Sequence, residues 1–202
     1  MPKTAFGGSH ERRVHVDSPE AVLQVAGAIF NYGVPHVASA DELVLLCIGT
    51  DRSTGDALGP LVGSRLTEGP QAGGYTVLGT LDNPVHASNL ADTLEVVNQT
   101  FRNPFVVAVD ASLGRVESVG LLTVGLGSLK PGAGVNKTLP AVGQVYVTGV
   151  VNVGGFMEYL VLQNTRLSLV VRMARIAAQG IDQGLTALVE YRSRSCSAGS
   201  QV

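Results

Sequence analysis

Two kinds of apolar pattern alternate along the chain, and together they predict an α/β fold. Short apolar runs without polar interruption are typical of strands that are buried on both faces of a sheet. Such runs occur at about residues 43–48 and 105–109, and further strands are predicted at about residues 75–79, 119–126 and 144–151. Apolar residues at helical spacing predict helices at about residues 18–33, 57–66, 90–97, 156–178 and 182–191.

The order of these elements indicates how the sheet is built. Helical patterns separate the first three strands, which favours parallel pairing through crossover connections. The last two strands are instead joined by residues 127–140, which contain too many Gly and Pro residues for a helix. We therefore predict an α/β fold with a mostly parallel sheet and helices on both faces.

Helix signals and the polar ends suggest the domain limits. Ser18, Pro19 and Glu20 are typical of a helix start, whereas Gly33 and Gly180 are predicted to end helices. Residues 1–17 are expected to form a flexible N-terminal arm and residues 192–202 a disordered tail. Residues 18–191 are expected to form one domain, because no linker or internal repeat divides them.

Composition narrows the class of protein and of partner. The 202 residues are 45% hydrophobic and only 15% charged, which suits a folded core and argues against disorder. A formal net charge of −2 gives no electrostatic reason to expect nucleic acid or an anionic membrane as partner. The sequence leaves the oligomeric state open, a homo-oligomer included.

Cysteines and the lack of targeting signals indicate the compartment. Cys47 lies inside an apolar run and Cys196 in the polar tail, so we expect no disulfide and a reducing compartment. The first 17 residues contain no apolar signal core, and no apolar run reaches the ~20 residues of a membrane helix. We therefore expect a cytoplasmic protein.

Two aspartates stand at the most informative positions of the chain. Asp56 lies in the Gly-rich loop after the strand at 43–48, and Asp110 directly follows the strand at 105–109. In an open α/β sheet, ligands and catalytic groups collect at the carboxyl ends of the strands. Two carboxylates there could share a proton, hold a water molecule or bind a metal ion. Each aspartate alone also has a plain structural interpretation, Asp56 as a helix N-cap and Asp110 as a turn former.

Other motifs are weaker. The loop at 49–60 does not have the G-x-G-x-x-G spacing, and its acids would repel phosphate. Residues 131–138 resemble a P-loop, but Asn136 replaces the required glycine and Pro140 opposes a following helix, so we expect no ATP binding. This segment is interpreted either as a loop that closes over a site or as a solvated connection. His86 could face the same cleft as the aspartates or cap a helix.

Three segments in order carry a resemblance to a known family. Residues 48–60, 107–111 and 130–137 resemble the signatures of the spore germination protease: a Gly-rich loop with Asp, a strand ending in Asp-Ala, and a Pro-Gly loop ending in Asn-Lys. Length and local detail resemble the YyaC-type sporulation proteins most. More remotely, the pattern is similar to the hydrogenase maturation endopeptidases.

This resemblance implies a three-layer α/β fold of the hydrolase or phosphorylase type, like that of the germination protease. The same resemblance implies an unusual aspartic peptidase whose two essential acids correspond to Asp56 and Asp110. It also implies a protein or peptide substrate, such as the small acid-soluble proteins of spores, in the cytoplasm of a sporulating cell or spore. No cofactor and no metal are expected. The residues expected to bind substrate are Thr50, Asp51, His86, Gly132, Gly134, Asn136 and Lys137.

The chain departs from the family in length, in the absence of a recognisable propeptide, and in Lys130, which replaces a histidine. Three hypotheses follow. The first is a peptidase in which one aspartate activates water and the other polarises the scissile carbonyl, with backbone N–H groups of the Gly-rich loops as oxyanion donors. The second is a non-enzymatic protein that binds a peptide or partner. The third is a metal-reading maturation endopeptidase with Asp56, Asp110 and His86 as ligands.

Overall fold

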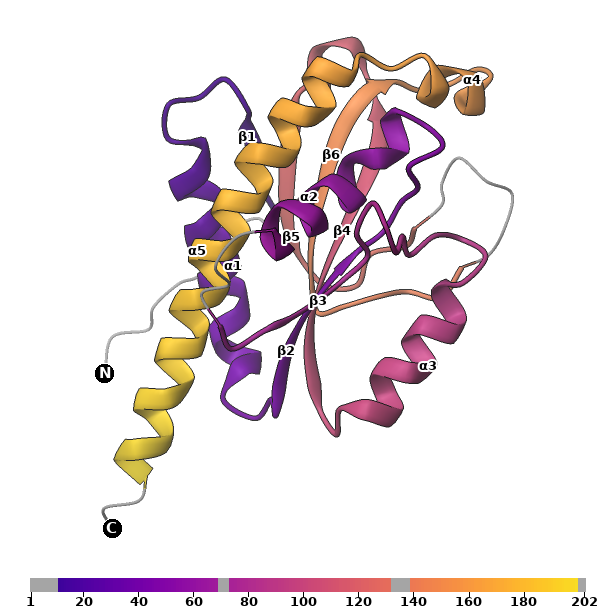
Figure 1. The fold of residues 1–202 in the computed structure, drawn as a ribbon. Coiled ribbons are helices and arrows are strands. Elements are labelled where there is room, and N and C mark those ends of the chain that lie inside the picture. Colours follow the sequence, from indigo (N-terminus) through magenta and orange to yellow (C-terminus); the bar gives the residue numbers. More distant parts are fainter. Residues whose placement is uncertain (1–10, 69–72, 132–138, 200–202) are drawn as a thin grey trace.

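The computed structural model describes residues 11–68, 73–131 and 139–199, and its described strands form one six-stranded sheet (Figure 1). The strand order is β1-β5-β6-β4-β2-β3. The strands are β1 (Glu11–His15), β2 (Glu42–Cys47), β3 (Thr76–Leu78), β4 (Pro104–Gly114), β5 (Leu121–Leu126) and β6 (Val145–Val153). β2, β3, β4 and β6 run parallel, whereas β5 is antiparallel to both β6 and β1.

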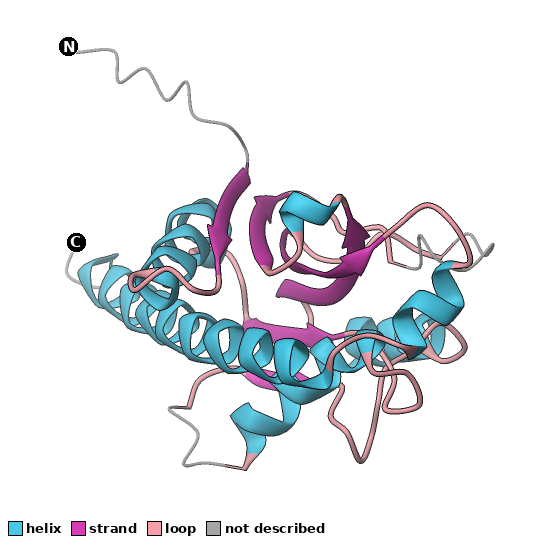
Figure 2. Cartoon of the chain, turned by 90° about the horizontal axis from the view of Figure 1, so that it is seen from above, coloured by secondary structure: helices cyan, strands magenta, loops and turns pink. Residues whose placement is uncertain are grey.

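Helices cover both faces of this sheet, as predicted. They are α1 (Ala21–Val37), α2 (Leu58–Thr67), α3 (Leu90–Thr100), α4 (Glu158–Gln163) and α5 (Leu167–Gly199), with the single-turn helices η1 (Gly55–Ala57) and η2 (Val116–Ser118). The main core lies between the sheet and α1, α2 and α5, and a smaller core lies on the opposite face beneath α3. The predicted three-layer α/β arrangement is therefore confirmed (Figure 2).

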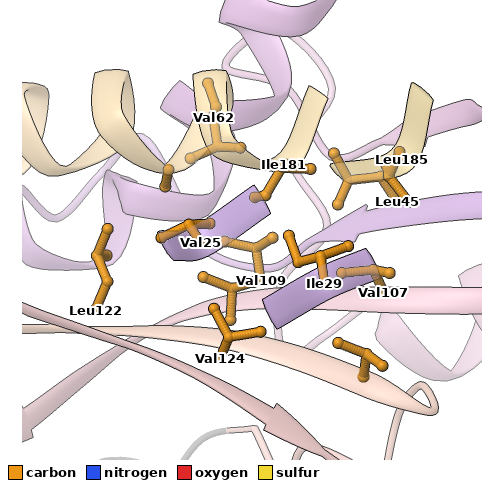
Figure 3. Packing of buried hydrophobic residues seen from close by; sticks show 14 of the residues in the cluster. Val25, Ile29, Leu45, Val62, Val107, Val109, Leu122, Val124, Ile181 and Leu185 are labelled. Atoms are coloured by element: carbon orange, nitrogen blue, oxygen red, sulfur yellow. The ribbon is translucent and has the colours of Figure 1, made fainter. Parts of the chain in front are cut away.

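The main core explains why the strand runs are continuously apolar. Alternate residues of one strand point to opposite faces: Val107 and Val109 join the main core, whereas Val106 and Ala108 join the smaller one. Figure 3 shows Val107 and Val109 beneath side chains of α1 and α5. Cys47 is fully buried in the same core, and burial raises the pKa of its thiol. The side chain of Cys196 lies outside the described residues.

Two glycines that were predicted to end helices lie inside them. α1 continues through Gly33 to Val37, and α5 continues through Gly180 to Gly199. A Cβ atom at Gly180 would lie 2.6 Å from Val25 Cγ1 of α1, and one at Gly33 would collide with Leu188 of α5. These glycines therefore permit the close approach of two long helices, a tertiary role that local helix signals do not reveal.

The predicted arm over residues 1–17 is wrong for residues 11–17, whereas residues 1–10 lie outside the described part. β1 pairs with β5, and Val14 and Val16 are buried beneath α1. The alternation is short and its outward residues are charged, so it resembles a solvated segment until β5 supplies the hydrogen-bonding partner.

The predicted disordered tail over 192–202 is helical as far as Gly199 in the structure, and residues 200–202 lie outside the described part. The Arg192 guanidinium donates hydrogen bonds to the carbonyl oxygens of Ala40 and Asp41, at 3.2 and 3.1 Å. The end of α5 is thus anchored beside the start of β2. No helix in the described part of the chain is long and apolar enough to span a bilayer.

Candidate active site

The candidate site lies where β2 ends beside β4. Ile48 follows β2, and its N–H donates to the Val109 carbonyl at 2.7 Å, so the chain leaves β2 directly alongside Asp110. Asp110 was predicted to follow the end of its strand, and this prediction is wrong. β4 continues past Asp110 to Gly114 because it pairs with β6. The end of β2 nevertheless exposes one edge of β4 at this position, which is where ligand sites form in open α/β sheets.

A tight loop returns Asp56 to this edge. Gly49 has a φ of 150°, and a Cβ atom there would collide with the Asp56 carbonyl oxygen, so glycine is required for the close approach. The Thr50 N–H donates to that same carbonyl at 3.1 Å. η1, which carries Asp56, contacts β4, which carries Asp110. The structure thus brings the segments of both predicted aspartates to one edge of the sheet.

Asp56 is a half-buried carboxyl and not a helix cap. Ala57 occupies the N-cap position of α2, and neither η1 nor α2 has a side-chain cap, so the capping interpretation is wrong. Burial raises the pKa of the half-buried Asp56 carboxyl. The Ser53 hydroxyl lowers this pKa, but Ser53 Oγ is buried without a well-formed hydrogen bond to any described group, so burial is the stronger effect.

Asp110 lies in a more polar setting. Its side chain is half-buried, and its Oδ1 accepts a hydrogen bond from the Ala111 N–H at 2.8 Å. By strand alternation Asp110 shares the face of Ala108, which belongs to the smaller core. Its carboxyl therefore points to the same face of the sheet as α3.

His86 lies next to the strand ends and lines a hollow in which neither Asp56 nor Asp110 takes part. Val85 forms a parallel bridge with Ile48, and its carbonyl accepts the Gly49 N–H at 2.8 Å. The half-buried His86 ring accepts the Ser88 N–H at Nδ1, at 3.3 Å, and lines a hollow of about 680 Å³ with Arg52.

The remaining predicted residues divide into two groups. Thr50 and Asp51 lie on the same loop as Asp56; the Thr50 hydroxyl accepts the Arg52 N–H at 3.3 Å, and Asp51 is exposed. The other four lie outside the described residues: Gly132, Gly134, Asn136 and Lys137.

The positions of these residues bear on the metal-site hypothesis and on the oxyanion donors of the peptidase hypothesis. Within the described part of the chain, no three His, Cys, Asp or Glu side chains gather closely enough to hold a metal ion. Asp56, Asp110 and His86 are therefore not assembled as a ligand set. The N–H groups of Gly49 and Thr50 are also engaged, with Val85 and Asp56, so oxyanion donors would have to come from elsewhere in the loops.

One wall of the site is apolar. Leu162 of α4 packs on Gly55, because a Cβ atom at Gly55 would lie 2.7 Å from Leu162 Cδ2. Asn152 anchors this short helix through hydrogen bonds to the Val161 carbonyl and the Thr165 hydroxyl, at 3.3 and 3.2 Å. Four side chains at its start are exposed by 45–80%: Phe156, Met157, Tyr159 and Leu160.

Sequence reasoning missed two neighbours of the aspartates. Ser53 lies buried in the Asp56 loop, and Thr148 of β6 is the direct cross-strand partner of Asp110. The signal for Thr148 was partial: Tyr146, Thr148 and Asn152 stand at alternate positions, but Val150 interrupts the polar side. Its pairing with Asp110 depends on strand register, which no local pattern supplies.

Comparison with known proteins places the chain in a family and among relatives. The model of a family described as "Protein of unknown function (DUF1256)" matches residues 13–180. "Uncharacterized protein YyaC" of Bacillus subtilis (strain 168) is 55% identical over 155 residues, which cover 77% of this chain and 74% of that protein. The predicted resemblance to YyaC-type proteins is thus confirmed.

A solved structure is also similar: the [NiFe] hydrogenase maturation protease HycI from Thermococcus kodakarensis KOD1, at 17% identity and a TM-score of 0.44. The match covers 77% of this chain and 97% of that one. Similarity at this level says nothing about function.

Proposed function

The chain belongs to the family of proteins of unknown function DUF1256, and we propose that it is a peptide hydrolase with a two-aspartate site. The substrate is a protein or peptide, and the proposed setting is the cytoplasm of a cell in sporulation or germination. The resemblance of three motifs to the spore germination protease motivates this reaction. The observation that supports it most is the half-buried Asp56 carboxyl, held on a turn that contacts the strand of Asp110.

The environments of the two acids suggest separate roles. Burial favours the protonated form of Asp56, so Asp56 donates a hydrogen bond to the scissile carbonyl. Asp110 is the ionised partner that takes a proton from the attacking water.

The test is cleavage of purified small acid-soluble spore proteins by the wild type and by Asp56→Asn, Asp110→Asn and the double variant. Asn keeps the shape of the side chain and removes the ionisable group. Each single variant is expected to lower kcat/KM by orders of magnitude, with the double variant little worse than either, because the two acids act as one unit.

Asp92→Asn is the matched control, since Asp92 is an exposed acid in the first turn of α3. It is expected to cleave like the wild type, and thermal unfolding verifies that all variants are folded. Wild-type rates in both single site variants would disprove the two-aspartate mechanism.

A second candidate function, peptide or partner binding without hydrolysis, is favoured by the exposed apolar side chains at the start of α4. Single exposed apolar residues are common, but a group of them in one short segment is typical of interaction sites. Absence of cleavage by the wild type, combined with binding of the same spore proteins that Phe156→Ser weakens, would favour this function over hydrolysis. The matched control is Leu23→Ser, because Leu23 is 68% exposed on α1.

A further inference from the structure

A row of polar side chains crosses the sheet from β1 to Asp110. Arg13 of β1 pairs with Thr123 of β5, Thr123 pairs with Thr148 of β6, and Thr148 pairs with Asp110 of β4. All four residues belong to the face opposite α1 and α5, because the residues that precede or follow them along each strand join the main core. The row therefore connects an arginine to the candidate catalytic site across four neighbouring strands.

The row forms the floor of a hollow of about 390 Å³. Arg13, Thr123 and Thr148 line it from the sheet, and Ser128 and Lys130 line it from the segment that follows β5. The hollow therefore reaches Thr148, the cross-strand partner of Asp110.

The lining is suited to an anion. It combines two cationic side chains, Arg13 and Lys130, with the hydroxyl groups of Thr123 and Thr148, which donate hydrogen bonds to oxygen acceptors. The hydroxyl groups of Ser128 and Tyr146 already donate, to the Gly143 carbonyl at 2.9 Å and to Glu11 at 2.7 Å. Glu11 is the one acidic residue in the lining, so the formal charge of the hollow is positive. Within the described part of the chain, Lys130 has no ion-pair partner.

Glu11 offsets one of the two positive charges, and Lys130 leaves the lining cationic. The Glu11 carboxylate accepts the Tyr146 hydroxyl at 2.7 Å and pairs with Arg13 Nη2 at 3.2 Å. The hydrogen bond from Tyr146 holds the pKa of Glu11 below its usual range. An arginine has five N–H donors in a planar fork, so one contact leaves donors of Arg13 available to a ligand.

We propose that this hollow, the carboxylate subsite, binds a carboxylate group of the polypeptide substrate while the scissile bond lies at Asp110. The inference rests on the proposed function and specifies its substrate class. Neighbouring strands lie ~4.8 Å apart, so Arg13 and Asp110 are separated by roughly 14 Å at the backbone. Allowing for the reach of the arginine side chain, the carboxylate lies about two to four residues from the scissile bond in an extended peptide.

The test measures binding rather than cleavage, so its failure is distinguishable from failure of the proposed function. Full-length Asp56→Asn protein, in which Asp110 is intact, is titrated with three peptides while backbone amide signals of Thr123 and Thr148 are followed by NMR. Acetyl-pentaalanine supplies a terminal carboxylate. A capped pentapeptide amide with one Glu supplies a side-chain carboxylate, and the same peptide with Gln supplies none.

At least one carboxylate peptide is expected to bind about tenfold or more tightly than the Gln peptide, because a hydrogen bond to a charged group contributes that much affinity. The stronger of the two identifies the source of the carboxylate. Arg13→Gln and Lys130→Gln are each expected to weaken this binding severalfold, with no effect on the Gln peptide.

Arg115→Gln is the matched control. Arg115 also pairs with a glutamate two residues away, Glu117 at 3.9 Å, but it does not line the hollow. The proposal would be overturned if the three peptides bound equally or if neither carboxylate peptide bound. It would also be overturned if Arg13→Gln and Arg115→Gln changed peptide binding to the same extent. Carboxylate binding without any cleavage activity would support the subsite and contradict the hydrolase.

Discussion

Tyr146 and Glu11 are 135 residues apart in sequence, and the Tyr146 hydroxyl donates to Glu11 Oε1 at 2.7 Å across the intervening strand β5. The residue between them is Gly125, which pairs with both, and a Cβ atom there would collide with the Tyr146 ring. Gly125 therefore lets the tyrosine ring lie flat over β5. This contact attaches β1 to the sheet beside the carboxylate subsite.

Tyr146→Phe is expected to lower the free energy of unfolding by roughly 1 kcal/mol at pH 7, because a hydrogen bond to a charged group is lost at a largely solvated site. The pKa of Glu11 is lowered from 4.5 in the folded protein. The contribution of this hydrogen bond to the free energy of unfolding is therefore present above pH 4.5 and is lost as the pH falls through the lowered pKa. Burial and Glu11 raise the pKa of Tyr146 from 10.0 to about 12, so stability is also lost as pH rises above 10.

Urea unfolding of wild type and Tyr146→Phe from pH 3 to pH 11 measures this prediction. The difference between the two proteins should be largest between pH 5 and 9 and should shrink at both extremes. A difference that does not vary with pH would show that the phenylalanine acts through packing alone.

Asp56→Asn is expected to raise the melting temperature at pH 7 but not at pH 3. Because burial raises the pKa of Asp56 above 3.8, folding favours its protonated form, and stability is lost as pH rises through the folded-state pKa. The neutral Asn avoids this loss, as in other functional sites that trade stability for activity. Calorimetry at both pH values tests the prediction, with Asp92→Asn as control.

Ser53→Ala is expected to move the alkaline limb of the pH profile of kcat/KM to higher pH. The Ser53 hydroxyl lowers the pKa of Asp56, so its removal keeps Asp56 protonated further up the pH scale. Ser168→Ala, an exposed serine at the start of α5, is the control. An alkaline limb that moves to lower pH would contradict the role of Asp56 as the protonated acid.

Gly180→Ala is expected to destabilise the protein by about 1–3 kcal/mol, because the new methyl group meets Val25 at the contact of α1 and α5. Gly27→Ala is the opposite case on the same helix pair. Gly27 is exposed in α1, and a Cβ atom there meets nothing within 4 Å. That variant is expected to gain roughly 0.5–1 kcal/mol from helix propensity. Denaturant unfolding gives both values, and equal signs would refute the close-contact explanation.

Arg192→Ala is expected to lower the melting temperature by about 2–4 °C, which corresponds to the loss of about 1 kcal/mol in a chain of this size. Its side chain anchors the end of α5 on the carbonyl groups of Ala40 and Asp41. Arg194→Ala removes an exposed arginine whose contact is a surface ion pair with Glu190, and no change is expected there. Identical melting curves for the two variants would contradict the anchoring role of Arg192 and favour the predicted disordered tail.

The sequence by itself determined the α/β class and the positions of the two aspartates. A strand that is buried on both faces must be apolar throughout. The apolar runs before Asp56 and Asp110 could therefore be identified as strands from the sequence alone, without knowledge of their pairing partners. The Gly-rich loop after β2 could also be predicted from the sequence, because Gly49 is required by a turn between residues that are close in sequence. These features depend on residues that are neighbours in sequence.

Only the tertiary structure decided the features that depend on distant partners. Gly180 breaks a helix by local rules, yet the contact with Val25 of α1 makes it part of a continuous α5. The charged stretch around Arg13 becomes a strand only when β5 is there to bond it. The row from Arg13 to Asp110 likewise follows from the register of three strand pairings, and a slip of one residue would turn each side chain to the opposite face. Register is set by burial of whole faces, which no single segment encodes.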